Sequence, residues 1–293
     1  MKVCVVGLIG RPNVGKSTLL NNILNYDLSI VSNYAQTTRD DIKGIYNEED
    51  FQIIFIDTPG IHKGEFALSE KLNQKSYSIL QEVDLILFLS PANEKIGKGD
   101  LWIINKLKEN NVENKIALIS KIDLVESKEQ LDEKANELKK MGFDTVLGTG
   151  LSYNQTFLDV INEIKKYAYE SEPLYPIDQI GDVSMRFMAK EIIREIAIKN
   201  LFNEVPHSIA VEINEFKEQE NTRPYLIDAT IYVKRESQKG ILVGKNGSKI
   251  KTISMNSRLK MEELFQHRIF LTTKVKVNEN WVDDLNKIKK MGY

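Results

Sequence analysis

A glycine-rich stretch near the N-terminus has the residue types and spacing of a phosphate-binding loop. It follows the pattern G-x-x-x-x-G-K-[ST] and reads Gly10-Arg11-Pro12-Asn13-Val14-Gly15-Lys16-Ser17. Glycines let the backbone curl so that its N–H groups and the start of the next helix face phosphate oxygens. In such a loop Lys16 reaches the β- and γ-phosphates, and the Ser17 hydroxyl binds Mg²⁺. We therefore predict a nucleoside triphosphate site that includes all eight residues.

A second segment with a chemical role follows the apolar run 51–56. It has the pattern D-x-x-G and reads Asp57-Thr58-Pro59-Gly60, followed by Ile61. At the carboxyl end of a strand, Asp57 can hold the metal through water and the Gly60 N–H can sense the γ-phosphate. Ligands bind at this edge of a parallel sheet, so we predict that these five residues belong to the same site.

The polar loop 33–40 between these two segments contains Thr37-Thr38-Arg39. A threonine here, for which we take Thr38, can coordinate Mg²⁺ only while the γ-phosphate is present. This behaviour is typical of an order-to-disorder switch. The predicted metal ligands are therefore Ser17, Thr38 and Asp57.

The choice of base depends on the segment Ser120-Lys121-Ile122-Asp123, which follows the apolar run 116–119. Guanine-specific proteins usually have Asn-Lys-x-Asp here, and the aspartate accepts two N–H donors that adenine does not offer. Ser120 departs from this pattern, and losing one hydrogen bond costs about 0.5 to 1.5 kcal/mol, or roughly threefold to tenfold in affinity. The loop at Thr149 and Gly150 also departs from the usual Ser-Ala. We predict weakened guanine binding and no change of base.

The composition indicates a globular protein of two domains. The chain has 293 residues, 42% of them hydrophobic and 28% charged, and this length is long for a single core. The one cysteine, Cys4, excludes an intrachain disulfide, and the three histidines have no spacing typical of a zinc site. No stretch approaches the ~20 apolar residues that span a bilayer, so we expect a cytoplasmic protein.

Alternating apolar and helical patterns position these segments in the first 170 residues. We expect strands at 3–9, 42–46, 53–57, 85–90, 116–120 and 145–147, and helices at 17–24, 68–81, 101–109, 128–141 and 156–169. Such alternation predicts an α/β domain with a mostly parallel sheet and helices on both faces. Two prolines and a glycine mark residues 171–181 as a linker.

The remaining residues, 182–293, have an α+β pattern and a different charge. We expect helices at 184–201, 247–258 and 262–266, and strands at 208–215, 226–233 and 270–277. Residues 1–181 hold 20 basic and 27 acidic residues (net −7), while 182–293 hold 20 and 15 (net +5). A basic domain suggests a polyanionic partner.

A four-residue motif inside the basic domain indicates which polyanion this domain binds. Gly244-Lys245-Asn246-Gly247 is a G-x-x-G before a helix, the element with which KH domains clamp about four single-stranded nucleotides. Nearby cations would neutralise phosphates. The predicted RNA-binding residues are this tetrad with Lys239, Lys249, Lys251 and Arg258.

These motifs, in this order, resemble those of the Era family of bacterial GTPases. The linker Tyr175-Pro176-Ile177-Asp178-Gln179 and the C-terminal segments 191–195, 204–206 and 236–247 are similar to the family's, as are 275–277, Trp281 and the final Gly292-Tyr293. The resemblance implies a Ras-like GTPase domain at 1–170, the linker at 171–181 and a KH domain at 182–293. It also implies binding to the 3′ end of 16S rRNA, a role in 30S subunit assembly and a peripheral association with the inner face of the cell membrane. His207 departs from the tyrosine that the family commonly has there, and we expect a structural role for it.

Hydrolysis is expected to proceed by in-line attack of water on the γ-phosphate, driven by positioning and charge stabilisation. Ras-like proteins place a water-orienting glutamine where this chain has Ile61, which cannot do that work. Asparagine at the position of Asn13 is associated in related GTPases with K⁺ binding. We therefore expect Asn13, Lys16, Thr38 and Gly60 to act in catalysis, with Mg²⁺ as cofactor and K⁺ as a second candidate cation.

Two alternatives remain open from the sequence. In one, the protein is chiefly an RNA-binding assembly factor with a weakened nucleotide site, as Ser120 and Thr149 suggest. In the other, it is a membrane-associated regulatory GTPase for which RNA is incidental. Binding to a guanine nucleotide and to an rRNA oligonucleotide separates the three interpretations. We expect a monomer without a DNA partner.

Overall fold

The computed structural model describes residues 1–31, 39–61, 67–200, 209–220, 223–279 and 281–291. The chain forms two compact units, one of residues 1–65 and 69–182 and the other of residues 66–68 and 183–293. Thr38, His62, His207, the segment 204–206 and the last two residues lie outside the described part. Among the helices that are described, none combines the length and apolar character needed to cross a bilayer.

The first unit is built on a sheet whose strands run in the order β2-β3-β1-β4-β5-β6. Their bounds are Lys2–Gly10 (β1), Ile42–Glu48 (β2), Phe51–Asp57 (β3), Leu85–Pro91 (β4), Lys115–Ser120 (β5) and Thr145–Gly148 (β6). Strands β3, β1, β4, β5 and β6 are parallel, and only the edge strand β2 of this series is antiparallel. The carboxyl ends of β1, β3 and β5 therefore share one edge, as the alternating pattern predicted.

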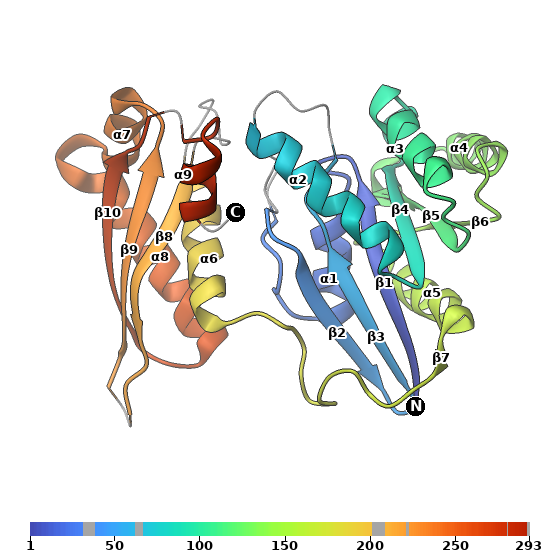
Figure 1. The fold of residues 1–293 in the computed structure, drawn as a ribbon, viewed down its shortest axis with the longest axis horizontal. Helices are drawn as coiled ribbons and strands as arrows, with labels where there is room; N and C mark the ends of the chain where they lie inside the picture. Colours follow the sequence, from blue (N-terminus) through green and yellow to red (C-terminus); the bar gives the residue numbers. More distant parts are fainter. Residues whose placement is uncertain (32–38, 62–66, 201–208, 221–222, 280, 292–293) are drawn as a thin grey trace. The chain divides into compact units, whose positions relative to one another are not determined.

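Helices cover both faces of this sheet, with α1 and α5 on one and α2 and α3 on the other (Figure 1). Their bounds are Lys16–Leu24 (α1), Ala67–Ser78 (α2), Lys98–Glu109 (α3), Lys128–Lys140 (α4) and Gln155–Ile164 (α5). Between the sheet and α2, α3 and α4 lies a core that includes Ile9, Phe88, Ile103 and Leu138. Cys4 is buried in β1, and its burial raises the thiol pKa to about 12, so this thiol is inert.

One predicted helix of this unit is too long. The expected helix 156–169 ends at Ile164, a short 3₁₀ turn follows, and Tyr169–Glu170 forms strand β7. β7 pairs antiparallel with Lys2 and Val3 at the start of β1. A pairing with residues so distant in sequence is invisible to local periodicity, because it depends on the finished sheet.

The second unit is an α+β domain with one small sheet. Its elements are Met185–Lys199 (α6), Ala210–Lys217 (β8), Tyr225–Val233 (β9), Glu236–Val243 (α7), Ser248–Phe265 (α8), Ile269–Val277 (β10) and Leu285–Lys290 (α9). The sheet order is β10-β9-β8, with β10 parallel and β8 antiparallel to β9. The predicted fold class, an α/β domain followed by a smaller α+β domain, is confirmed.

Two details of this unit differ from the prediction. The expected helices 247–258 and 262–266 are one helix, α8, because residues 259–261 include no helix-breaking residue. Helix α7 was not predicted, because Gly240 and its polar neighbours mask its short apolar stripe. The segment 191–195 is buried in α6, where Arg194 bonds Glu191 and where Glu195 accepts from Lys260 of α8, so it stabilises the helix packing.

Candidate functional site

The glycine-rich loop connects the end of β1 to the start of α1. Gly15 caps α1 with φ 103° and Asn13 has φ 63°, left-handed conformations that glycine and asparagine adopt most readily. Lys16, only 6% exposed, donates to the carbonyl oxygens of Gly10 (3.3 Å) and Arg11 (3.2 Å). The loop thus curls around the ammonium group that the sequence assigns to the phosphates.

Burial lowers the pKa of the Lys16 ammonium to about 8, although Asp57 partly offsets this effect. A polyphosphate beside the ammonium would favour its charged form and raise that pKa again. Above pH 8, nucleotide binding must then take up a proton.

This linkage predicts a pH dependence of nucleotide affinity. The dissociation constant for GDP should rise about twofold from pH 7 to 8 and about fivefold from pH 8 to 9, approaching tenfold for each further pH unit, because the free protein loses the charge that the complex keeps. Calorimetric titration at pH 7, 8 and 9 in buffers of different ionisation enthalpy measures both the affinity and the proton uptake. Equal dissociation constants at pH 8 and 9 would contradict the assignment.

The predicted metal ligands Ser17 and Asp57 are brought together. The Ser17 hydroxyl donates to Asp57 Oδ2 at 2.6 Å, while Asp57 Oδ1 is buried without a hydrogen-bond partner in the described structure. Burial raises the pKa of this carboxyl, and Lys16 and neighbouring hydroxyls oppose the rise. A buried carboxylate oxygen with no donor fits a cation. Among the residues that the structure describes, no group of three His, Cys, Asp or Glu side chains could hold a metal by itself.

The segment after β3 packs against the phosphate loop. Thr58 donates to the Leu8 carbonyl oxygen at 2.7 Å, and a methyl group at Gly60 would lie 2.6 Å from the Cα of Pro12. Ile61 donates its N–H to the Gly10 carbonyl at 3.0 Å, and its side chain is fully buried. The Ile61 side chain therefore belongs to the core and cannot orient a water molecule.

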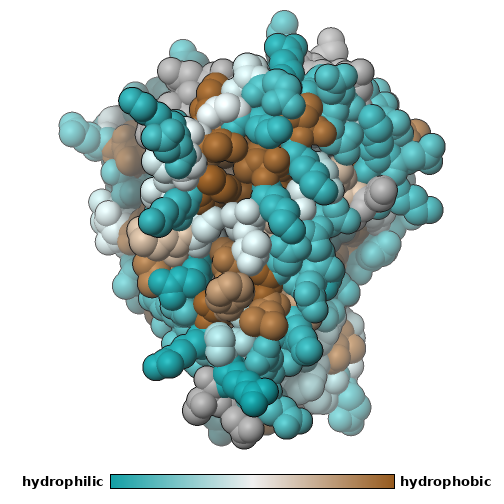
Figure 2. All heavy atoms as spheres, turned by 90° about the vertical axis from the view of Figure 1, so that its left-hand side faces the viewer, coloured by the Kyte–Doolittle hydropathy of each residue, from teal (hydrophilic) through white to brown (hydrophobic). Residues whose placement is uncertain are grey.

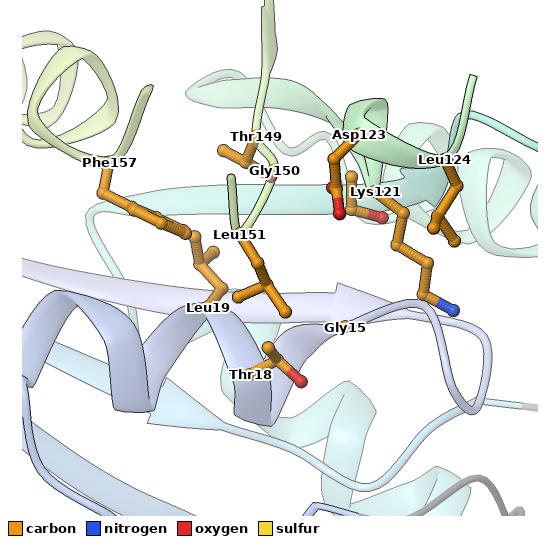
Figure 3. Close-up of a pocket in the computed structure, with 11 residues that line it drawn as sticks. Gly15, Thr18, Leu19, Lys121, Asp123, Leu124, Thr149, Gly150, Leu151 and Phe157 are labelled. Atoms are coloured by element: carbon orange, nitrogen blue, oxygen red, sulfur yellow. The ribbon is translucent and has the colours of Figure 1, made fainter. Parts of the chain in front are cut away.

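A pocket of about 270 Å³ lies beside this loop. Figure 3 shows Asp123 and Lys121 directed into it on one side, opposite Phe157 and Leu19. Its other lining residues are Gly15, Thr18, Ser120, Leu124, Thr149, Gly150 and Leu151. A carboxylate that faces apolar side chains suits a planar base with two N–H donors. The sequence did not single out Leu19, Leu124 or Phe157, because apolar residues near a motif look like ordinary core positions, nor Thr18, which looks like an ordinary residue of the predicted helix 17–24.

Ser120 lines the pocket and also bonds the phosphate loop. Its hydroxyl donates to the Val14 carbonyl oxygen at 2.6 Å, and the side chain is 4% exposed. Lys121 makes a parallel bond, since its ammonium donates to the Asn13 carbonyl oxygen at 2.7 Å. Ser120 and Lys121 therefore tie the base-recognition segment to the phosphate loop across more than 100 residues of sequence.

Replacing Ser120 by alanine should lower the affinity for GDP about threefold to tenfold, since one hydrogen bond of roughly 0.5 to 1.5 kcal/mol that holds the two halves of the site together is lost. Titration with a fluorescent GDP analogue measures this change. An unaltered affinity would mean that the bond to Val14 contributes nothing to the site.

The loop after β6 continues the pocket wall. Thr149 donates its N–H to the Ile119 carbonyl (2.8 Å) and accepts from the Ile122 N–H (3.1 Å). The Gly150 N–H donates to the Thr156 hydroxyl at 3.4 Å. Thr149 and Gly150 thus fix the backbone around Asp123, although the Gly150 N–H is already engaged by a side chain.

Arg11 directs its guanidinium away from the phosphate loop. It donates to Asp100 at 2.9 Å and to Glu94 at 2.7 Å, and Asp100 is fully buried at the start of α3. Arg11 therefore contributes its backbone to the phosphate site, while its side chain anchors the loop to α3.

In the second unit, the G-x-x-G tetrad forms the turn between α7 and α8. Gly244, Asn246 and Gly247 have φ of 70°, 53° and 74°, and a methyl group at Gly244 would lie 2.9 Å from the Cβ of Lys249. The positive φ disfavours a side chain at both glycines, and at Gly244 the space is also taken by Lys249. Two positions without side chains in one turn let a nucleic-acid backbone approach it.

The predicted cations surround this turn unequally. Lys245 and Lys251 are exposed and Lys249 is half-buried. Lys239 pairs with Glu236 at 3.6 Å, and Arg258 pairs with Glu262 at 3.2 Å. The first three lysines are thus the stronger candidates for phosphate contacts.

Exposed apolar side chains accompany these charges. Met255 and Leu259 on α8 and Phe270 on β10 are 48%, 50% and 60% exposed. Figure 2, which views the side on which α7 and β10 lie in Figure 1, shows apolar atoms gathered among hydrophilic ones. Exposed apolar side chains in a basic domain suit unstacked bases on a charged backbone.

Comparisons with known proteins match both parts of the chain. A model described as a 50S ribosome-binding GTPase matches residues 5–142, and a KH-domain model matches residues 204–282. The chain is 49% identical over 293 residues to the GTPase Era of Mycoplasmopsis agalactiae, covering 100% of both, and 51% identical over 292 residues to that of Mycoplasmopsis pulmonis, covering 99% of both.

Two solved structures are similar along the whole chain. One is a variant of Aquifex aeolicus Era bound to GDP·AlF₄⁻, and the other is Era in complex with MgGDPNP and nucleotides 1506–1542 of 16S ribosomal RNA. Each is 35% identical, with a TM-score of 0.95, and the match covers 100% of this chain and 99% of the other.

Proposed function

The chain belongs to the Era family of GTPases, and from this premise we propose that it couples GTP hydrolysis to binding of the 3′ region of 16S rRNA during assembly of the 30S subunit. One observation carries the proposal: the phosphate loop, Asp57 and Asp123 lie at one edge of the sheet, and a pocket lined by Gly15 and Asp123 opens beside the loop. The domains we assign are 1–170 for GTP hydrolysis, 171–181 as linker and 182–293 for RNA.

In the nucleotide site, we assign the phosphates to the loop 10–17 and to Gly60, and the base to the segments 120–123 and 149–150. Mg²⁺, which a relative holds together with GDPNP, would be held by Ser17 and Asp57, with Thr38 as a third ligand, and would supply positive charge against the phosphates. Lys16 and the loop N–H groups stabilise the negative charge that develops as water attacks in line.

The alternative of an RNA-binding assembly factor with a weakened nucleotide site has less support than an active GTPase. A site that no longer binds nucleotide would not need the buried Lys16, the Asp57 oxygen that has no hydrogen-bond donor, or the open pocket beside Asp123. Retaining all three costs stability that only a ligand restores. The Ser120 hydroxyl, moreover, is used to hold the phosphate loop.

We propose K⁺ as a second cation at Asn13, because Ile61 cannot orient water and the active site needs another source of positive charge. Turnover should be slow, and it should be faster in K⁺ than in Na⁺. Steady-state phosphate release in each chloride salt, at equal ionic strength, measures the difference. Equal rates in the two salts, with Asn13→Ala unaffected, would remove K⁺ from the mechanism.

For the second unit, we propose that the tetrad 244–247 clamps the RNA backbone while Met255, Leu259 and Phe270 contact bases. The test is binding of an oligonucleotide with the sequence of the 16S rRNA 3′ end, measured at several salt concentrations. Affinity should fall steeply as salt rises, since cations are released from the RNA. Absence of binding at low salt would refute the RNA function.

We retain three further proposals about the cellular context: a cytoplasmic location with peripheral contact to the inner face of the membrane, a monomeric state and association with the 30S subunit. The membrane-regulator alternative is separated from the RNA function by the same titration. It predicts no preference for the 3′-end oligonucleotide over an unrelated RNA of equal length.

A further inference from the structure

Four charged side chains, here called the charge cluster, join the phosphate loop to helices α3 and α4. They are Arg11 of the loop, Glu94 between β4 and α3, Asp100 in the first turn of α3 and Lys134 of α4. Asp100 is fully buried and Lys134 is 6% exposed. Burial of a charge is costly unless the charge is paired and hydrogen-bonded. The contacts that pair these charges therefore fix the elements that carry them, outside the lining of the pocket beside Asp123.

The Arg11 side chain is held on three sides. Its Nε donates to Asp100 Oδ1 at 2.9 Å, and its Nη2 donates to Glu94 Oε2 at 2.7 Å. The stem of the side chain lies against the backbone of Gly99, where a methyl group would come within 2.7 Å of Arg11 Cδ. Arg11 therefore cannot shift without breaking two ion pairs or moving the start of α3.

Both carboxylate oxygens of Asp100 are used. Oδ1 accepts from Arg11, and Oδ2 accepts from the Gly97 N–H at 2.9 Å, a bond that caps the start of α3. A carboxylate offers only acceptors, whereas an asparagine amide offers one acceptor and one donor group. Asparagine at this position would therefore turn N–H groups toward Arg11 or toward Gly97, and one of the two bonds would be lost.

Lys134 fixes the segment that carries Glu94. Its ammonium donates to the carbonyl oxygens of Pro91 and Glu94, each at 2.6 Å. The segment is thus attached to α4, and it presents the Glu94 carboxylate to Arg11. Methionine at position 134 would keep the stem of the side chain and remove its donors, which would release the segment.

The charge cluster acts on one half of the phosphate loop. The Arg11 carbonyl oxygen accepts from Lys16 at 3.2 Å, and a methyl group at Gly60 would lie 2.6 Å from the Cα of Pro12. Gly60 is the residue that we assign to the γ-phosphate, so the half of the loop around Arg11 and Pro12 lies on the γ-phosphate side. Gly15, near the other end of the loop, lines the pocket for the base. The two halves can therefore be disturbed separately.

We propose that Asp100 and Lys134 are positioning residues for GTP hydrolysis. Through Arg11, they hold the half of the phosphate loop that faces the γ-phosphate. A displacement of about 1 Å near reacting atoms can slow a reaction about a hundredfold. GDP has no γ-phosphate, so its affinity depends on the other half of the loop and on the base pocket. This inference rests on the proposed function and names residues that support its chemical step.

Asp100→Asn tests the proposal by comparing rate with affinity. The rate of a single turnover of GTP, measured per molecule able to bind GDP, should fall at least about tenfold, while the dissociation constant for GDP stays within about twofold. A merely structural role would reduce the number of molecules that bind GDP, and it would not slow those that do. An unchanged rate, or a GDP affinity that falls by the same factor as the rate, would overturn the proposal.

Lys134→Met is the second variant, and it decides the matter if Asp100→Asn does not fold. It should show the same separation of rate from affinity, with a rate at least about threefold lower. The matched controls are Glu109→Gln, which removes an exposed ion pair with Lys106 from the same helix as Asp100, and Lys139→Met at an exposed position of α4. Both controls should keep the rate and the affinity of the unaltered protein.

A double variant tests whether the effect passes through Arg11. Arg11→Gln alone should slow hydrolysis at least as much as Asp100→Asn, since it loses both ion pairs. Adding Asp100→Asn should then change the rate by less than about twofold, because the partner of the carboxylate is already gone. Losses that multiply in the double variant would refute the route through Arg11.

Nucleotide binding separates this proposal from the proposed function. If the unaltered protein does not hydrolyse GTP, the GTPase assignment fails, and the charge cluster is tested by affinity alone. Asp100→Asn should weaken binding of a non-hydrolysable GTP analogue at least about fivefold more than binding of GDP, because only the analogue has a γ-phosphate. Equal losses for the two nucleotides would show that the charge cluster does not act on the γ-phosphate side.

Discussion

Replacing Asp123 by asparagine should lower the affinity for GDP by about three orders of magnitude and create affinity for xanthosine diphosphate. The carboxylate accepts two N–H donors of guanine, and two charge-assisted hydrogen bonds are worth roughly 4 kcal/mol together. Asparagine offers one acceptor and one donor, which suits xanthine, whose ring has a carbonyl where guanine has an amino group. Calorimetric titration of both nucleotides measures the exchange of specificity.

The exposed Asp132 on α4 provides the control, since Asp132→Asn makes the same change of charge away from the pocket. It should alter neither affinity. If Asp123→Asn bound GDP as tightly as the unaltered protein, the pocket between Asp123 and Phe157 would not be the guanine site.

Replacing Gly244 by aspartate should weaken binding of the rRNA oligonucleotide at least about a hundredfold. The residue has φ 70°, a conformation that costs a side chain about 1 to 2 kcal/mol, and its Cβ would meet Lys249 at 2.9 Å. The new carboxylate would also face the phosphates that the turn is proposed to clamp. Fluorescence anisotropy with a labelled oligonucleotide measures the loss.

Gly240→Asp separates the geometry of the turn from its charge. It adds the same charge on α7, four residues earlier, where a Cβ would have no neighbour within 4 Å. We expect it to weaken RNA binding no more than about threefold. An equal loss in the two variants would mean that charge alone acts and that the turn is not a clamp.

The nucleotide site could be predicted from the sequence because its parts are short segments at the ends of strands. In a parallel sheet, the residues after β1, β3 and β5 must meet at one edge, so the places of Lys16, Asp57 and Asp123 followed from the order of the elements. The tetrad 244–247 could be placed before a helix because its G-x-x-G pattern directly precedes a helical segment.

What the sequence could not predict depends on pairs of residues far apart in the chain. Three bonds join residues separated by about 90 to 120 positions: the bond from Ser120 to Val14, the pairing of Arg11 with Asp100, and the bond from the Gln52 amide to the Tyr175 carbonyl. Each partner alone has an ordinary explanation, as a departure from a motif, a phosphate contact or a strand residue. Only the folded chain shows which groups satisfy one another.

The most direct test of the account is the affinity of the full-length protein for the rRNA 3′-end oligonucleotide with GDP, with a non-hydrolysable GTP analogue and without nucleotide. A protein that couples the two sites should show dissociation constants that differ at least about fivefold between the GDP and GTP-analogue states. Identical affinities in all three states would contradict the account, since nucleotide and RNA would then bind independently.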